Sequence, residues 1–186
     1  NGGIAVIDSK TLSLVEDIEL PGHPESFQVD EDAGKVFVNV PGMHQIVVID
    51  LNKNKITEKW EITEASSNFP MALDTAGHRL FVGCRNPAKL LIIDTGSGKT
   101  VASLNIDKDT DDVFFDSIRK KIYASCGGGY LDIISQDGPK NYYSASKVET
   151  RSGARTSLFI PELSQLVIAA PASSGDQARL MVYSIK

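Results

Sequence analysis

The sequence contains no apolar run that approaches the roughly 20 residues of a membrane-spanning helix. It has only two cysteines in 186 residues, too few for a disulfide framework. Basic residues are outnumbered, with 19 Lys and Arg against 24 Asp and Glu and a formal net charge of −5. Because non-specific nucleic-acid binding needs a basic surface, this balance argues against a nucleic-acid partner. What is left is a globular protein, and an apolar content of 41% can supply its core.

An initiator methionine and a signal peptide are also missing. The chain opens on Asn1-Gly2-Gly3, directly before a strand-like run. This start fits either processing or truncation, so we draw no conclusion about targeting from it. By length alone, the chain holds one domain or two small ones.

The most informative feature that is present is an internal repeat. Each copy has an apolar strand, a polar turn and a second strand. The copies read SFQVDEDAGKVFVNV, PMALDTAGHRLFVGC, DVFFDSIRKKIYASC and SLFIPELSQLVIAAP, starting at Ser26, Pro70, Asp112 and Ser157. These starts are 44, 42 and 45 residues apart.

Aspartates mark fixed places in this repeat. The first three copies carry Asp30, Asp74 and Asp116 in register, and the fourth has Pro161 there. A second series ends the strands IAVID, IVVID and LLIID, and its members are Asp8, Asp50 and Asp94. Because an Asp side chain can accept hydrogen bonds from backbone N–H groups of the following turn, we assign this second series a structural role.

Each unit reads as four short strands joined by turns rich in Asp, Gly, Asn and Lys. Helical repeats of similar length would show a 3.6-residue period, which is not evident. A unit of about 40–45 residues with four strands is typical of a β-propeller blade. The sequence therefore predicts an all-β fold, a partial β-propeller of four-stranded antiparallel blades. The predicted units are a half-blade at 1–25, blades at 26–69, 70–111 and 112–156, and an incomplete last blade at 157–186.

Several stretches carry a family resemblance. KVFVNV, RLFVGC and KIYASC resemble the name-giving strand of YVTN-type propellers. GHPESFQVD, HQIVVID and GARTSLFIPEL resemble its bacterial YncE-like branch, whereas Trp60 lacks the Trp-Asp setting of WD40 repeats. The resemblance implies a seven-bladed full-length fold and export to the bacterial periplasm or cell surface, and it implies no particular biochemical role.

The number of blades does not match a closed ring. At roughly 43 residues per blade the chain makes about four and a half blades, whereas seven need about 300 residues. Two interpretations stay open: the chain is the C-terminal part of a seven-bladed protein, or copies associate edge to edge as a homo-oligomer. Unpaired strand edges favour association.

Two motifs resemble ligand sites only in part. Gly96–Thr100 ends like a P-loop, but Ile93 stands where the first glycine is needed. The run Asp107–Asp112 alternates carboxylates like a calcium loop, but Asp112 and Ile118 replace the Gly and Glu of an EF-hand. We interpret the first as a hairpin turn and the second as a solvated loop, with a calcium site of another kind left open.

The two cysteines occupy equivalent positions on successive blades. Cys84 and Cys126 align with Val40 and Ala170 of the other copies. Small apolar substitutes favour a buried core role for both thiols. A disulfide between neighbouring blades and a soft-metal site are the alternatives.

The loops that lead from one blade to the inner strand of the next are expected to open onto the central channel, where propellers bind ligands. Their chemistry differs from blade to blade although the surrounding turns repeat, as a binding site requires. Arg could grip a carboxylate or phosphate, and His with Asp could hold a cation. The candidate ligand-binding residues at this channel rim are His23, Glu25, Asn68, Arg85, Asp111, Asp112 and Arg155.

Three functions are compatible with this rim. The preferred one is a non-catalytic propeller that binds a small ligand or a protein partner. The second is an enzyme, either a metal-assisted hydrolase of the lactonase sort that uses His23 with the neighbouring carboxylates, or part of a redox propeller enzyme. The third is a surface-layer or adhesion scaffold. No nucleophile elbow and no cofactor attachment motif occur in the sequence, so we expect no cofactor and favour the non-enzymatic reading.

Overall fold

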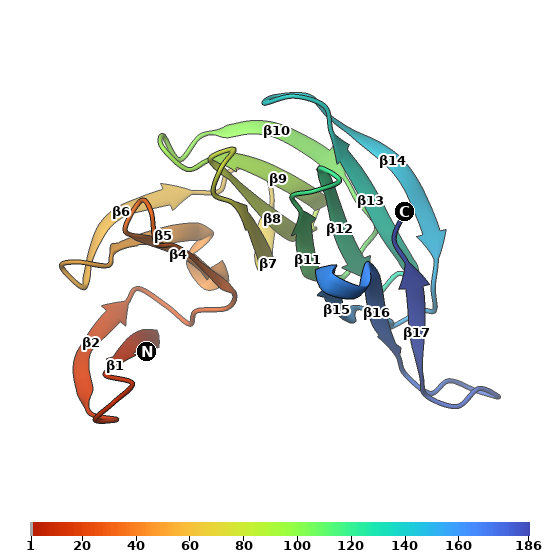
Figure 1. The fold of residues 1–186 in the computed structure, drawn as a ribbon, viewed down its shortest axis with the longest axis horizontal. Helices are drawn as coiled ribbons and strands as arrows, with labels where there is room; N and C mark the ends of the chain where they lie inside the picture. Colours follow the sequence, from red (N-terminus) through yellow and green to blue (C-terminus); the bar gives the residue numbers. More distant parts are fainter. Residues whose placement is uncertain (1) are drawn as a thin grey trace.

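The computed structural model describes residues 2–186 and shows a succession of five antiparallel sheets. The sheets follow one another along the chain and form an open arc around a common concave side (Figure 1). This arrangement confirms the predicted all-β fold, a partial β-propeller. Among residues 2–186, no helix has the length and apolar character to cross a membrane.

The sheets form in sequence order, each by simple antiparallel hairpins. The first contains β1 (Gly2–Ile7) and β2 (Leu14–Leu20). The second contains β3 (Phe27–Asp30), β4 (Lys35–Val40), β5 (Gln45–Asp50) and β6 (Lys55–Glu61). The third contains β7 (Ser66–Asp74), β8 (Arg79–Asn86), β9 (Ala88–Asp94) and β10 (Thr100–Asn105). The fourth contains β11 (Thr110–Asp116), β12 (Lys121–Cys126), β13 (Tyr130–Gln136) and β14 (Tyr142–Glu149). The fifth contains β15 (Thr156–Ile160), β16 (Gln165–Ala170) and β17 (Arg179–Ser184).

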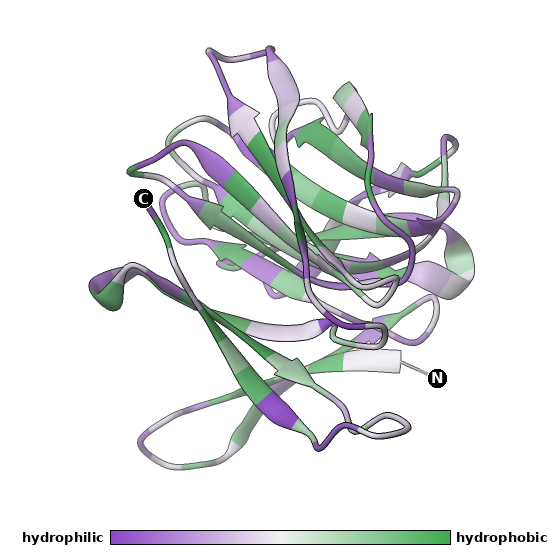
Figure 2. Ribbon diagram, turned by 90° about the vertical axis from the view of Figure 1, so that its right-hand side faces the viewer, coloured by the Kyte–Doolittle hydropathy of each residue, from purple (hydrophilic) through white to green (hydrophobic). Residues whose placement is uncertain are grey.

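The hydrophobic core lies between the sheets. Four clusters of buried side chains each join two consecutive sheets, and Figure 2 shows the hydrophobic stretches running along the strands. From the N-terminal to the C-terminal interface, they include Ile18 and Val38, then Phe37 and Trp60, then Phe81 and Ile122, and finally Tyr123 and Leu166. Each sheet therefore depends on its neighbours to bury its faces.

Strand β8 shows why the second strand of each repeat reads as a continuous apolar run. Leu80 and Val82 pack into the interface with the preceding sheet, whereas Phe81 packs into the interface with the following sheet. All three side chains are fully buried. A strand that is covered on both faces has no polar alternation, as in buried parallel sheets.

The turn aspartates act as the sequence predicts. Asp8 accepts the backbone N–H groups of Lys10 and Thr11 at 2.9 and 2.7 Å. Asp50 does the same in the next unit, and Asp94 accepts the N–H of Ser97 at 2.9 Å. The last contact closes the β9–β10 hairpin, so the P-loop-like stretch is a hairpin turn.

Candidate functional site

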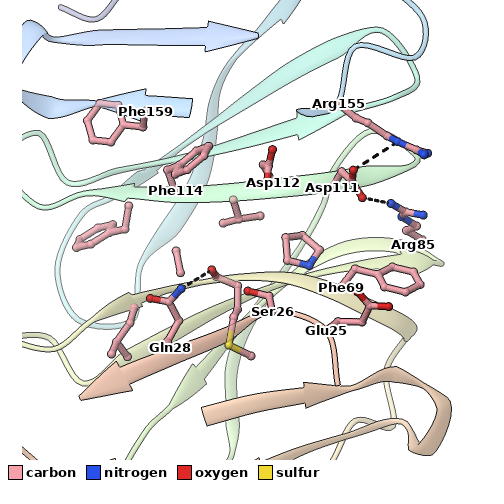
Figure 3. Close-up of a pocket in the computed structure, with 16 residues that line it drawn as sticks. Glu25, Ser26, Gln28, Phe69, Arg85, Asp111, Asp112, Phe114, Arg155 and Phe159 are labelled. Carbon is pink, nitrogen blue, oxygen red and sulfur yellow. Dashed lines mark hydrogen bonds and ion pairs between the residues drawn. The ribbon is translucent and has the colours of Figure 1, made fainter. Parts of the chain in front are cut away.

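A cavity of about 680 Å³ opens on the concave side of the arc. It is lined by residues on or beside the inner strands β3, β7, β11 and β15 of four successive sheets, together with Arg85 of β8 (Figure 3). The site therefore draws on most of the chain, although each sheet contributes only a few side chains.

Two repeat positions supply much of the lining. The first position of the aligned copies gives Ser26, Pro70 and Asp112 to the cavity. The third position gives Gln28, Ala72, Phe114 and Phe159. Because side chains two residues apart project from the same face of a strand, both positions face the concave side.

Two arginines and two aspartates form a closed ring of ion pairs at one end of the cavity. Asp109 contacts Arg85 at 3.3 Å and Arg155 at 2.6 Å. Asp111 contacts Arg155 at 3.5 Å and also pairs with Arg85. Hydrogen bonding to Asp109 raises the pKa of Arg155 further above its ordinary value. The ring carries no net formal charge.

Arg85 is held by more than the ring. Its Nε donates to the carbonyl oxygen of Thr110 at 2.9 Å. Its guanidinium lies 4.4 Å from the centre of the Phe69 ring, in cation–π geometry. Both arginines are thus engaged by protein groups, so the structure does not offer them as a free clamp for a carboxylate or phosphate.

Asp112 differs from the ring aspartates. Its carboxylate accepts the backbone N–H of Ser157 on β15 at 2.6 Å. Among residues 2–186 it forms no ion pair. Burial raises the pKa of Asp112, and the charge of Asp111 adds to this effect, while the hydrogen bonds from Ser157 oppose it.

Five of the seven predicted rim residues line the cavity together: Glu25, Arg85, Asp111, Asp112 and Arg155. His23 is exposed and lies outside the lining. Asn68 is fully buried, and its Nδ2 donates to the Asn39 side chain at 2.8 Å and to the Gln45 carbonyl at 3.3 Å. The structure therefore gives Asn68 an anchoring contact between two sheets, and it leaves His23 outside the cavity that the other five residues line.

The Asp107–Asp112 segment is bound internally. Asp107 contacts Lys147 at 3.3 Å, while Asp109 and Asp111 belong to the arginine ring. Within residues 2–186, no group of three or more His, Cys, Asp or Glu side chains is placed to hold a metal ion. The cation partners of this loop are side chains of the protein.

The cysteines are separate core residues. Cys84 packs with the second and third sheets, and Cys126 packs between the third and fourth. Both thiols are free and fully buried, and burial raises the pKa of each to about 12. Their microenvironments are those of small core hydrophobes.

The sequence analysis did not predict the phenylalanines that line the cavity, nor one aspartate of the ion-pair ring. Phe69, Phe114 and Phe159 line the cavity, and Asp109 joins both arginines. The period of two along the inner strands carries the signal for Phe114, since it lies two residues after Asp112. Nothing in the sequence indicates that Asp109 faces two arginines from different sheets.

Comparison with known proteins places the chain among propellers. No model of a known protein family matches it. It is 27% identical over 127 residues to the YncE protein of Salmonella typhimurium, which is described as uncharacterised. This match covers 66% of the chain and 35% of that protein. The YncE protein of Salmonella typhi is 28% identical over 106 residues, covering 54% of the chain and 30% of that protein. The chain is a YncE-like β-propeller.

Solved structures support the same fold for this YncE-like propeller. Hydrazine synthase of Kuenenia stuttgartiensis superimposes with a TM-score of 0.76 at 16% identity, over 89% of the chain and 47% of that protein. The dihydro-heme d1 dehydrogenase NirN gives a TM-score of 0.73 at 12% identity, over 91% and 37%. Sqt1 of Saccharomyces cerevisiae gives 0.72 at 13% identity, over 97% and 49%. At these identities the likeness concerns the fold alone.

The YncE-like propeller spans about a third of the length of the curated relatives it matches. It spans between 37% and 49% of the three structural neighbours.

Proposed function

We propose that this YncE-like propeller is a non-catalytic binding protein that takes a small ligand in the concave cavity. The observation that carries the proposal is the lining itself, because the chemistry varies at repeat positions of the same architecture: Ser26, Pro70 and Asp112 at the first, and Gln28, Ala72, Phe114 and Phe159 at the third. A volume of about 680 Å³ is within the range of small-molecule sites. The ion-pair ring at one end, and Phe114 with Phe159 at the other, would fix the orientation of a ligand.

The hydrolase alternative has less support. It uses His23 with Glu25, Asp111 and Asp112, and of these four residues only His23 lies outside the cavity lining. A scaffold that acts through its outer faces makes a different prediction, since compounds would not bind on the concave side.

A fragment screen followed by protein NMR tests the proposal. We expect compounds that shift the signals of cavity residues, and we expect Ser26→Phe to abolish those shifts by filling the cavity. The matched control is Ser117→Phe, because Ser117 is exposed in the turn between β11 and β12. If no compound of any charge binds at the cavity, or if Ser26→Phe binds as well as the parent, the proposal is wrong.

We also propose a bacterial periplasmic or cell-surface location. The supporting observation is the likeness to the two Salmonella proteins. Fractionation of cells that express the natural full-length protein from its own gene tests this, and recovery from the cytoplasmic fraction would contradict it.

A further inference from the structure

The charges that line the cavity do not balance. The ring of Arg85, Arg155, Asp109 and Asp111 is neutral as a unit, since each arginine contacts both aspartates. Glu25 and Asp112 also line the cavity, and neither forms an ion pair within residues 2–186. The cavity therefore keeps two carboxylates whose charge the described side chains do not neutralise.

Comparison between the repeats singles out Asp112. Its equivalents in the other three copies are Ser26, Pro70 and Ser157, which are all uncharged. Turn formation does not require the carboxylate at this position, because the other units fold without one. Its carboxylate accepts hydrogen bonds from Ser157, and the backbone N–H of that residue lies 2.6 Å from Oδ2.

Aromatic rings lie next to this carboxylate. Phe114 follows Asp112 by two residues on β11 and so projects from the same face. Phe159 of β15 packs beside it, with 6.4 Å between the ring centres. Figure 3 shows both rings at the end of the cavity opposite Arg85 and Arg155.

The remaining polar group at this end presents an acceptor. The Nε2 of Gln28 donates to the carbonyl oxygen of Met71 at 3.1 Å, which leaves the Gln28 amide oxygen for other partners. Carboxylate and amide oxygens accept hydrogen bonds, and aromatic faces attract positive charge. An ammonium or guanidinium group can interact favourably with the Asp112 carboxylate, the Gln28 amide oxygen and the aromatic faces. An anion would be repelled by the carboxylate and has no hydrogen to donate to either oxygen.

We infer that the cavity selects organic cations with an apolar or aromatic body, with the charged group on Asp112 and the body against Phe114 and Phe159. This inference rests on the proposed ligand-binding function and narrows it to one chemical class. It differs from the expectation that the arginines bind an anionic ligand, because Arg85 and Arg155 already form ion pairs with Asp109 and Asp111.

Three probes of nearly equal shape test the charge preference: phenethylammonium, 3-phenylpropionate and 2-phenylethanol. Each is titrated into the protein, and binding is followed by NMR signals of cavity residues, which register weak complexes. We expect the ammonium probe to bind at least about tenfold more tightly than the other two, by the strength of a charge-assisted hydrogen bond.

Amino-acid substitutions test which residues cause the preference for the ammonium probe. Asp112→Asn keeps the shape and the acceptor for Ser157, and we expect it to lose that tenfold or greater advantage. Phe114→Leu should weaken binding of the ammonium probe by roughly 2- to 12-fold, the range of aromatic pair contributions, because the phenyl body of the probe loses its contact with the ring. Asp32→Asn is the matched control, because Asp32 is exposed in the β3–β4 turn.

The outcomes separate this inference from the function on which it rests. Preferred binding of the carboxylate or the alcohol would overturn the charge selection while leaving a ligand-binding cavity. If the ammonium probe binds the Asp112→Asn variant with the same affinity as the parent protein, the role of Asp112 is overturned. If the probes fail and the fragment screen yields only neutral or anionic ligands, the inference is wrong and the binding function stands.

Discussion

Asp112 combines a functional role with a cost to stability. Burial raises the pKa of this carboxyl above its ordinary value of 3.8, so the folded protein holds the proton more tightly than the unfolded chain. Stability must then fall as pH rises from 3.8 through the raised pKa. A carboxylate kept in place despite this cost is what a binding site requires.

We predict that Asp112→Asn is at least as stable as the parent protein at neutral pH. The difference in unfolding free energy should shrink as pH approaches 3.8, where the unfolded chain also takes up the proton. Urea unfolding followed by the fluorescence of Trp60, the single tryptophan, measures it. A variant less stable than the parent at neutral pH would show that the carboxylate holds the sheets together.

The thiols make a second prediction at this scale. Because burial raises the pKa of Cys84 and Cys126 to about 12, neither forms a thiolate near neutral pH in the folded protein. We expect a thiol reagent at mildly alkaline pH to label neither residue in the native state and both in denaturant. Rapid native labelling of either thiol would show that its interface opens.

Among the elements, the β9–β10 hairpin carries the sharpest steric constraint. Gly98 has a φ of 69°, and a Cβ atom there would lie 2.5 Å from the indole of Trp60. Gly138, in the loop between β13 and β14, has a φ of 85° and no atom within 4 Å of such a Cβ. Both glycines have a positive φ, and they differ in what surrounds them.

We predict that Gly98→Ala destabilises the protein by about 2–4 kcal/mol, from backbone strain and overpacking together. Gly138→Ala should lose only the backbone part, about 1–2 kcal/mol. Guanidinium unfolding followed by circular dichroism compares them. Equal losses would mean that the hairpin and Trp60 move apart without cost.

The elements also show what sequence can and cannot predict. The hairpin turn at Gly96–Thr100 and the turn roles of Asp8, Asp50 and Asp94 follow from local patterns, and the structure confirms them. The arginine ring does not, because Arg85 and Arg155 reach it from different sheets and their pairing depends on how those sheets pack. Local periodicity fixes strands and faces, but partners across an interface are set by tertiary geometry.

At the scale of the whole molecule, the fifth sheet has a free side. Strand β17 is its last strand, with one edge unpaired among the described residues. Leu158 and Val182 are each 58% exposed, and the register sets both opposite Val167 on one face. An open edge beside an apolar face is a surface that favours association.

We therefore expect this chain to self-associate as its concentration rises, measured by sedimentation velocity. Val182→Lys should reduce the association by placing a charge on that face. Ile118→Lys is the control, because Ile118 is 81% exposed in the β11–β12 turn, outside the fifth sheet. A monomer at all concentrations, or equal association of both variants, would contradict the expectation.

The division of the core into four interfaces has a consequence for cooperativity. Each cluster couples only adjacent sheets, so stability spreads as in a chain of nearest neighbours and the terminal sheets can fray independently. The cavity is different, because its lining comes from four sheets at once. A bound ligand would therefore link units that share no core, and unfolding that is gradual in the free protein would become a single, sharper transition in the complex.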